Sequence, residues 1–243
     1  MKKVAVITGA SRGIGAATAL LLAQKGYSVC VNYRNAEDKA QKIVSSILKQ
    51  NGNAIAVQAD IASENDILNL FKTVDAQLGP VTVLINNAGI NGGVCAVEDI
   101  SSEKLHAVFT TNVFGAFLSS REAIQRMKKN GGGCIINVSS EAAKFGGTQM
   151  AHYSASKAAL NTFTLALARE GAPHNIRVNA VSPGVIDTEL HQHSSSERVS
   201  QLILSLPMKR MGTTEEVAST IAWLVSEEAS YVSGALIPIT GAR

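Results

Sequence analysis

Cysteine is scarce in this sequence of 243 residues. Cys30, Cys95 and Cys134 lie far apart, their number is odd, and none forms a Cys-x-x-Cys pair. This excludes a disulfide framework, which needs an even number of regularly spaced cysteines in a secreted chain. The three residues are typical of free thiols in a reducing compartment, so we expect a cytoplasmic protein.

Clusters of metal ligands and of positive charge are also missing. His191 and His193 flank Gln192, but no carboxylate or cysteine cluster completes a metal site, so we expect no metal. The net charge is +3, and the densest basic group, residues 121–129, also contains Glu122. We interpret that group as a solvated helix face. Without a continuous basic footprint we expect no nucleic-acid partner.

Long apolar runs and linkers are absent as well. Met1–Lys3 and the short apolar run after them resemble the start of a signal sequence, but they lead directly into a glycine turn without a cleavage-type boundary. No run has the length needed to span a membrane. With 46% hydrophobic residues and a mean hydropathy of +0.13, the chain can build one large core. We therefore expect a single domain over residues 1–243 and no membrane partner.

What the sequence does contain is a regular alternation of strand and helix patterns. Expected strands start at the apolar run from Val4 and continue at residues 28–33, 54–58, 81–86, 134–138, 177–181 and 235–239. Expected helices follow the glycine turn to residue 25 and cover residues 36–50, 64–77, 103–128, the segment from Tyr153 to about 170, and 214–226. This alternation predicts an α/β fold, a doubly wound parallel sheet of Rossmann type with helices on both faces. Ligands bind such sheets at the carboxyl ends of the strands.

A glycine-rich turn follows the first expected strand. Gly9, Gly13 and Gly15 have the spacing Gly-x-x-x-Gly-x-Gly, immediately before an Ala/Leu-rich helix. Such a turn directs backbone N–H groups and a helix N-terminus at a diphosphate. It could be a plain connection, but its position at the first strand-to-helix junction favours nucleotide binding.

Three residues in the second half suggest acid–base chemistry. Tyr153 and Lys157 lie four residues apart in an expected helix, which places both on one face. A nearby ammonium group lowers the pKa of a phenol from its usual ~10, so we expect Tyr153 to exchange protons at neutral pH. Ser140 follows an expected strand, and its hydroxyl can reach the Tyr153 and Lys157 side chains. Ser139 is an alternative candidate for the same role. By spacing alone, a Tyr–Lys pair is more often part of a solvated helix face.

Taken together, these motifs resemble the short-chain dehydrogenase/reductase family along essentially the whole chain. The matching positions are Thr8, Gly9, Gly13, Gly15, Asp60, Ile61, Asn86 to Gly89, Asn112, Ser140, Tyr153, Lys157, Pro183 and Gly184. The resemblance implies hydride transfer between a nicotinamide cofactor and a carbonyl or secondary alcohol. It makes Tyr153 the general acid/base and Ser140, chosen over Ser139 by the family's spacing, the hydrogen-bond donor to the substrate oxygen. Lys157 would lower the pKa of Tyr153 and hold the nicotinamide ribose, and Asn112 would complete a proton relay, although it could equally satisfy helix backbone.

The resemblance also indicates which cofactor binds. An acidic residue after the second strand would select NAD(H), whereas this chain has Asn32, Tyr33 and Arg34 there, and Arg12 in the glycine turn. Guanidinium groups bind phosphate well, so NADP(H) is expected over NAD(H). The full set of expected cofactor contacts is Gly9, Ser11, Arg12, Gly13, Ile14, Gly15, Tyr33, Arg34, Asp60, Ile61, Asn87, Ala88, Gly89, Tyr153, Lys157, Pro183, Gly184, Ile186 and Thr188.

The substrate is less readable, because residues 187–210 correspond to the family's variable lid. The chain looks most similar to the 3-oxoacyl-[acyl-carrier-protein] reductase and glucose 1-dehydrogenase branches. It departs from the former at Glu141, where a small or apolar residue is common, and at the tail Thr240–Arg243, where an Asn-Gly-Gly sequence is usual. We expect a reductase of 3-oxoacyl thioesters or small ketones. The alternatives are a sugar 1-dehydrogenase and, in a different class, a non-catalytic NADP(H)-binding regulatory protein.

Two further expectations concern surfaces. The helices at residues 103–128 and 163–170 and the strand at 236–239 carry more apolar surface than one sheet face needs, and relatives in this family pair such elements, so we expect a homotetramer. An acidic acyl carrier protein would need a basic surface beside the site. Candidates for it are Arg126, Lys128, Lys129 and Arg169, with a solvated face as the alternative.

Overall fold

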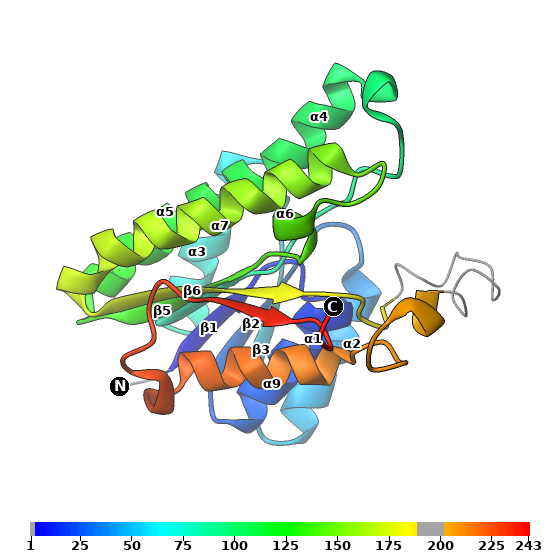
Figure 1. The fold of residues 1–243 in the computed structure, drawn as a ribbon. Helices are drawn as coiled ribbons and strands as arrows, with labels where there is room; N and C mark the ends of the chain where they lie inside the picture. Colours follow the sequence, from blue (N-terminus) through cyan, green and yellow to red (C-terminus); the bar gives the residue numbers. More distant parts are fainter. Residues whose placement is uncertain (1–2, 189–201) are drawn as a thin grey trace.

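The computed structural model describes residues 3–188 and 202–243. Its centre is a seven-stranded parallel sheet with the order β3-β2-β1-β4-β5-β6-β7 (Figure 1). The strands are β1 (Val4–Ile7), β2 (Ser28–Tyr33), β3 (Asn53–Gln58), β4 (Val83–Asn86), β5 (Gly133–Val138), β6 (Ile176–Pro183) and β7 (Leu236–Ile239). The order reverses direction at β1, which is the doubly wound topology expected from the sequence. That reversal opens a crevice at the carboxyl ends of β1 and β4.

Helices cover both faces of the sheet, as expected. One face carries α1 (Gly13–Gln24), α2 (Glu37–Lys49) and α9 (Thr214–Val225), and the other carries α3 (Glu64–Gln77), α5 (Gly115–Lys129) and α7 (Ala151–Gly171) (Figure 1). Two shorter helices, α4 (Ser102–Phe109) and α6 (Ala142–Phe145), lie at the carboxyl edge. Among the described residues, no helix is both long and apolar enough to cross a bilayer.

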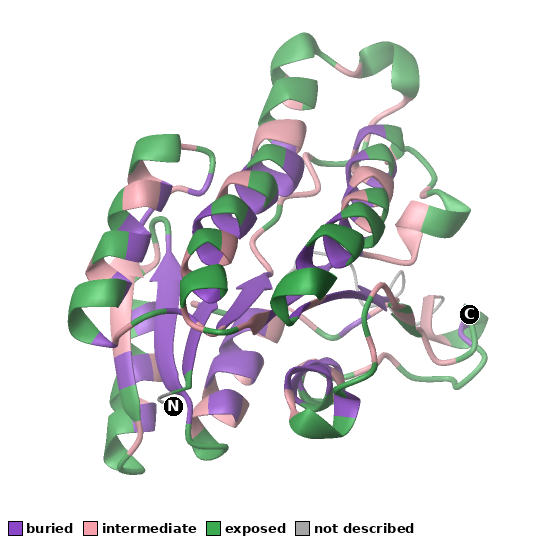
Figure 2. Ribbon diagram, turned by 90° about the vertical axis from the view of Figure 1, so that its left-hand side faces the viewer, coloured by how far each residue is buried: buried purple, intermediate pink, exposed green. Residues whose placement is uncertain are grey.

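Two hydrophobic clusters, one on each face, hold these layers together. In β1, Ala5 and Ile7 point into the cluster beneath α1 and α9, whereas Val4 and Val6 point into the cluster beneath α3, α5 and α7. Successive side chains of a strand face opposite sides, so a strand buried on both faces reads as a continuous apolar run. Figure 2 shows the result, with buried strands inside helices whose outer faces are exposed.

Most element boundaries agree with the sequence prediction, and the main exception has a local cause. The predicted helix 103–128 is interrupted: α4 is followed by a π-helical segment, Thr110–Phe114, before α5 begins. A π turn contains one residue more than an α-helical turn. Because the chain stays helical on both sides, the spacing of apolar residues does not reveal this extra residue. Such π turns are rare in proteins, and those that occur are often found at functional sites. This one contains Asn112.

Candidate active site

A cavity of about 630 Å³ opens at the carboxyl edge, over the crevice between β1 and β4. Most of the expected cofactor contacts line it, namely Gly9, Ser11, Arg12, Gly13, Tyr33, Arg34, Asp60, Ile61, Asn87, Ala88, Gly89 and Thr188. The structure adds residues that sequence reasoning missed: Asn32, Asn35, Ala36, Ala59, Ile90 and Thr111. Ile14 and Gly15 lie in the first turn of α1 behind the cavity wall.

The glycine turn needs glycine for reasons that the geometry makes specific. Gly9 has φ +61°, and a Cβ there would lie 2.9 Å from the Cα of Ala88. A Cβ on Gly15 would lie 2.5 Å from Nδ2 of Asn87. These close approaches pack the start of α1 against the segment that follows β4. The N-terminal N–H groups of α1 therefore face the cavity, where they suit an anion.

Asn32 holds this turn in place, a role that sequence reasoning did not assign. Its side chain is buried, its Oδ1 accepts a hydrogen bond from the Gly9 amide (3.1 Å), and its Nδ2 donates to the carbonyl of Ala59 (3.0 Å). An amide can join a donor and an acceptor in this way, and a carboxylate cannot. In the sequence, this role could have been inferred from the position of Asn32, a polar residue within an otherwise apolar strand.

Two side chains at the outer end of the cavity carry charge. Arg34 follows β2, and its side chain is 55% exposed, with Nη1 3.9 Å from Oδ2 of Asp60. Asp60 follows β3 and accepts a hydrogen bond from the Ala62 amide (2.9 Å) through Oδ1. At 3.9 Å and this exposure the pair is weak. The guanidinium group of Arg34 is therefore accessible from the cavity.

Ser140, Tyr153 and Lys157 meet at the carboxyl end of β5. The Ser140 hydroxyl is hydrogen-bonded to the Tyr153 phenol, and Oγ of Ser140 also accepts from the Ala142 amide (3.2 Å). Ser139 is oriented differently: its Oγ donates to the main-chain carbonyl of Lys157 (3.2 Å), which ties α7 to the strand. The geometry therefore pairs Ser140, rather than Ser139, with the tyrosine.

Lys157 does not act on Tyr153 as the sequence predicted. Its Nζ donates to the carbonyl of Val138 (2.8 Å) and lies 5.8 Å from the centre of the Tyr153 ring. Burial raises the pKa of Tyr153 above its usual value, and the hydrogen bond with Ser140 opposes this shift. Burial also lowers the pKa of Lys157 to about 8. The prediction that Lys157 lowers the tyrosine pKa is wrong for this structure, because desolvation dominates in a buried site.

Asn112 lies in the π turn and bridges two segments. Its Oδ1 accepts from the Ile90 amide (2.8 Å), and its Nδ2 donates to the Ile90 carbonyl and to Oγ of Ser156 (2.9 Å each). A Cβ on Gly89 would lie 3.2 Å from Oδ1 of Asn112 and 3.3 Å from Nζ of Lys157. Asn112 and Lys157 therefore reach the same point beside Gly89, and the side-chain amide fixes the loop that follows β4.

The remaining expected contacts lie at the end of β6 and in the segment that follows it. Pro183 ends β6, Gly184 follows it, and Thr188 reaches the cavity wall. The side chain of Ile186 is buried in the core beneath α1 and α9, so it does not line the cavity. His191, Gln192, His193 and the serines 194–196 of the expected lid lie outside the described residues.

The predicted basic docking surface is not beside this site. Arg126, Lys128 and Lys129 end α5 just before β5 begins, and Arg169 lies near the end of α7 before β6 begins. All four are therefore at the amino edge of the sheet, opposite Ser140. Arg126 also forms ion pairs with Asp75 (2.7 Å) and Glu122 (3.0 Å). That prediction is wrong because a helix returning across a parallel sheet ends at the opposite edge from the site.

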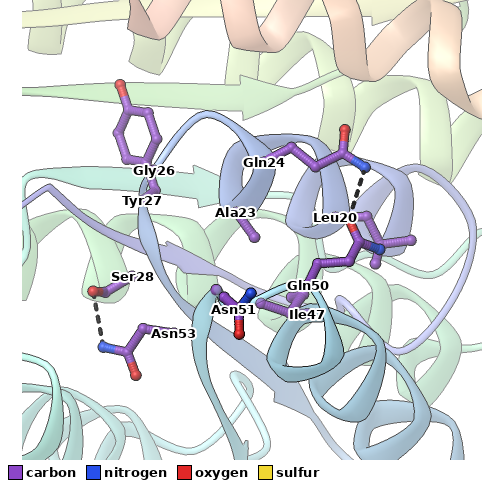
Figure 3. Close-up of a pocket in the computed structure, with 11 residues that line it drawn as sticks. Leu20, Ala23, Gln24, Gly26, Tyr27, Ser28, Ile47, Gln50, Asn51 and Asn53 are labelled. Carbon is purple, nitrogen blue, oxygen red and sulfur yellow. Dashed lines mark hydrogen bonds between the residues drawn. The ribbon is translucent and has the colours of Figure 1, made fainter.

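A second hollow, of about 480 Å³, also lies at the amino edge, between the ends of α1 and α2 (Figure 3). Its polar groups are already paired in part: Gln24 Nε2 donates to Gln50 Oε1 (3.5 Å), and Asn53 Nδ2 donates to Ser28 Oγ (2.9 Å). The described residues that line it carry no charge. This hollow offers neither a cation nor a helix N-terminus to a nucleotide.

Comparison with known proteins agrees with the geometry at the carboxyl edge. The family model described as short chain dehydrogenase matches residues 3–199. The oxidoreductase YgfF of Escherichia coli is 46% identical over 99% of both chains, and the 3-oxoacyl-[acyl-carrier-protein] reductase FabG of Staphylococcus epidermidis is 36% identical over 99% of this chain and 98% of its own. A mutant of a Serratia marcescens short-chain dehydrogenase/reductase superposes with a TM-score of 0.93 at 34% identity, over 99% of this chain and 97% of that one. This chain is therefore an oxidoreductase of the short-chain dehydrogenase/reductase family, a membership that implies a nicotinamide cofactor.

Proposed function

We propose that this protein is an NADPH-dependent reductase of 3-oxoacyl thioesters or small ketones. The observation that carries the proposal is that Ser140 and Tyr153 meet Lys157 at the sheet edge where the cavity opens. Lys157 lies beside Gly89 of the cavity wall, and the exposed Arg34 lines the same cavity. Ser140 and Tyr153 would supply the acid–base chemistry, and Arg34 would supply a cation that binds a phosphate.

The residues that line the cavity support an NADP(H) site. The glycine turn and the N-terminus of α1 would hold the diphosphate, where a Cβ on Gly9 or Gly15 would clash. Arg34, with Arg12, would bind the 2′-phosphate, and Asp60 with Ile61 would border the adenine. The segment Asn87–Gly89, with Lys157, would hold the riboses. The nicotinamide would lie near Pro183, Gly184 and Thr188.

When bound, the reduced nicotinamide supplies a hydride to the carbonyl carbon. Negative charge then develops on the carbonyl oxygen, where Ser140 donates a hydrogen bond and Tyr153 transfers its proton. Because burial raises the pKa of Tyr153, the phenol keeps its proton at neutral pH and is ready to donate it. Asn112 and Lys157 would return a proton to Tyr153 after each turnover.

The alternatives are weighed on the relatives and on the residues present. The 36% identity to the 3-oxoacyl-[acyl-carrier-protein] reductase FabG, over 98% of that protein, supports the reductase over a glucose 1-dehydrogenase. A non-catalytic NADP(H)-binding protein would be expected to lack part of the set Asn112, Ser140, Tyr153 and Lys157, and all four are present.

We also propose a homotetramer. Phe117 on α5 is 45% exposed and stacks on Phe163 of α7, with ring centres 3.6 Å apart. Trp223 on α9 (40% exposed) and Leu236 on the edge strand β7 (37% exposed) add exposed apolar surface on two further elements. Light scattering at micromolar concentration tests this, and a monomer would contradict it. A single domain over residues 1–243 and a cytoplasmic location stay predictions of the sequence.

The function is tested by following nicotinamide absorbance with acetoacetyl thioesters, small diketones and glucose, each with both cofactors. We expect NADPH-linked reduction of a keto substrate to be the fastest reaction. A faster oxidation of glucose would favour the sugar dehydrogenase. Tight NADPH binding without turnover of any substrate would favour the regulatory protein.

A further inference from the structure

Two residues at which this chain departs from the pattern of its reductase relatives contact each other. Nη1 of Arg243 donates a hydrogen bond to Oε1 of Glu141 at 2.7 Å, although the two residues are 102 positions apart in the sequence. The Glu141 side chain is 13% exposed, whereas that of Arg243 is 47% exposed. The ion pair therefore joins a nearly buried carboxylate beside Ser140 to the segment that follows β7.

The path of that segment brings Arg243 back over the site. The amide of Gly184 donates to the carbonyl of Ile239 (3.0 Å), which fixes the end of β7 beside β6. Gly241 and Ala242 then both adopt left-handed backbone conformations, with φ +62° and +67°. The chain bends at Thr240 and Gly241. The left-handed region is unfavourable for alanine by about 1 kcal/mol, so tertiary contacts must hold this turn.

Glu141 needs its cation. Its Oε2 is buried and has no hydrogen-bond partner within the described part of the chain, and a Cβ on Gly184 would lie 3.2 Å from that atom. Burial raises the pKa of Glu141, and Arg243 opposes the shift. A buried charge that loses its partner is strongly unfavourable. Removal of Arg243 would therefore drive the Glu141 side chain toward water and displace its backbone.

That backbone positions the Ser140 hydroxyl. The Ser139 amide donates to the carbonyl of Val181 (2.8 Å), and the Glu141 amide donates to the carbonyl of Pro183 (3.0 Å), so Ser140 is fixed from both sides. The next amide, that of Ala142, donates to Oγ of Ser140 (3.2 Å). A shift at Glu141 would loosen both of the downstream hydrogen bonds.

We propose that the Glu141–Arg243 ion pair is a latch by which the segment after β7 positions the Ser140 hydroxyl to donate its hydrogen bond to the substrate carbonyl oxygen. Arg243 and Glu141 are thus positioning residues. The latch rests on the proposed reductase function, and it explains why the two departures occur together in one chain.

Steady-state kinetics of Arg243→Ala test the latch. We expect kcat for the best keto substrate to fall about ten- to a hundredfold, the cost of a small misplacement of a reacting group, while the Kd for NADPH stays unchanged. Adding Glu141→Gln to Arg243→Ala should recover most of kcat, because an amide needs no cation. Arg243→Lys should also recover part of it. The matched control is Arg121→Ala, which removes a pair of the same 2.7 Å length with Glu64 of α3, and a 3.3 Å pair with Glu122 of α5, from an arginine of similar exposure (44%). Neither α3 nor α5 carries Ser140.

Hydrogen exchange provides a readout that needs no substrate. The amides of Glu141 and Ala142 should exchange faster in Arg243→Ala than in the wild type or in Arg121→Ala. Unchanged exchange, or faster exchange with unchanged kcat, would overturn the latch. If the wild type reduces no carbonyl compound, the proposed function fails, and exchange alone decides the latch, with faster exchange supporting it and unchanged exchange overturning it.

Discussion

The ammonium group of Lys157 donates a hydrogen bond to the carbonyl of Val138, at 2.8 Å, on the strand that leads to Ser140. Lys157 thereby anchors α7 to β5. It holds a buried positive charge that forms no ion pair with a carboxylate in the described part of the chain. Burial of this kind is unfavourable for the folded protein, and it lowers the pKa of the lysine to about 8. The buried Lys157 therefore lowers the stability of the folded protein, and this effect on the free energy of unfolding can be measured.

Lys157→Met should stabilise the protein at pH 7 while it abolishes turnover. The pKa of this lysine is 10.5 when unperturbed and about 8 in the fold. Below pH 8 both states bind the proton, so the full cost of the buried charge is present. Between these two values the unfolded chain binds more protons, so wild-type stability rises with pH. We expect the variant to gain about 1–3 kcal/mol at pH 7, less the lost hydrogen bond to Val138.

Urea unfolding without cofactor, at pH 7 and at pH 9.5, checks this expectation. The advantage of the variant should shrink at the higher pH. An advantage that does not shrink between pH 7 and pH 9.5 would show that the pKa of Lys157 is not lowered in the folded protein.

Tyr153→Phe should remove turnover and leave NADPH binding nearly unchanged, because the change deletes the acidic oxygen alone. General acid–base catalysis typically contributes at least about a hundredfold, so kcat should fall by that factor or more. Kinetics and fluorescence titration with NADPH measure the two effects. Near-normal turnover would mean that another group supplies the proton.

Arg34→Ala should weaken NADPH binding about ten- to a hundredfold and leave NADH binding almost unchanged, since a charge-assisted hydrogen bond contributes roughly 1.5–3 kcal/mol. The Kd of each cofactor gives the answer. Equal losses for the two cofactors would show that Arg34 does not contact the 2′-phosphate.

Asn32→Asp should destabilise the protein by about 2–4 kcal/mol without creating a preference for NADH. The Asn32 side chain faces the glycine turn and the Ala59 carbonyl, so a carboxylate there would repel that carbonyl and lose a buried donor. The matched control is Asn35→Asp, an exposed position on the same cavity, where the new charge should weaken NADPH binding and leave thermal stability unchanged. Tight NADH binding by Asn32→Asp would contradict the inward orientation of this side chain.

The sequence by itself determined the layers, the sheet edge that carries the chemistry and the family. These properties are local: they depend on apolar runs, on the spacing of the glycines and on the interval between Tyr153 and Lys157. Local patterns can be recognised in the sequence without the structure. The range of β2 and that of α3 were predicted to the residue for the same reason.

Tertiary structure alone decided the properties that depend on neighbours distant in the chain. The pKa of Tyr153 follows from burial in the folded protein, which outweighs the hydrogen bond with Ser140. The role of Asn32 depends on Gly9 and Ala59, and the end of α5 lies opposite the site because the helix crosses the sheet. The contact between Glu141 and Arg243 exists because β7 pairs with β6 and the chain bends after β7, a relationship that spacing in a sequence does not encode.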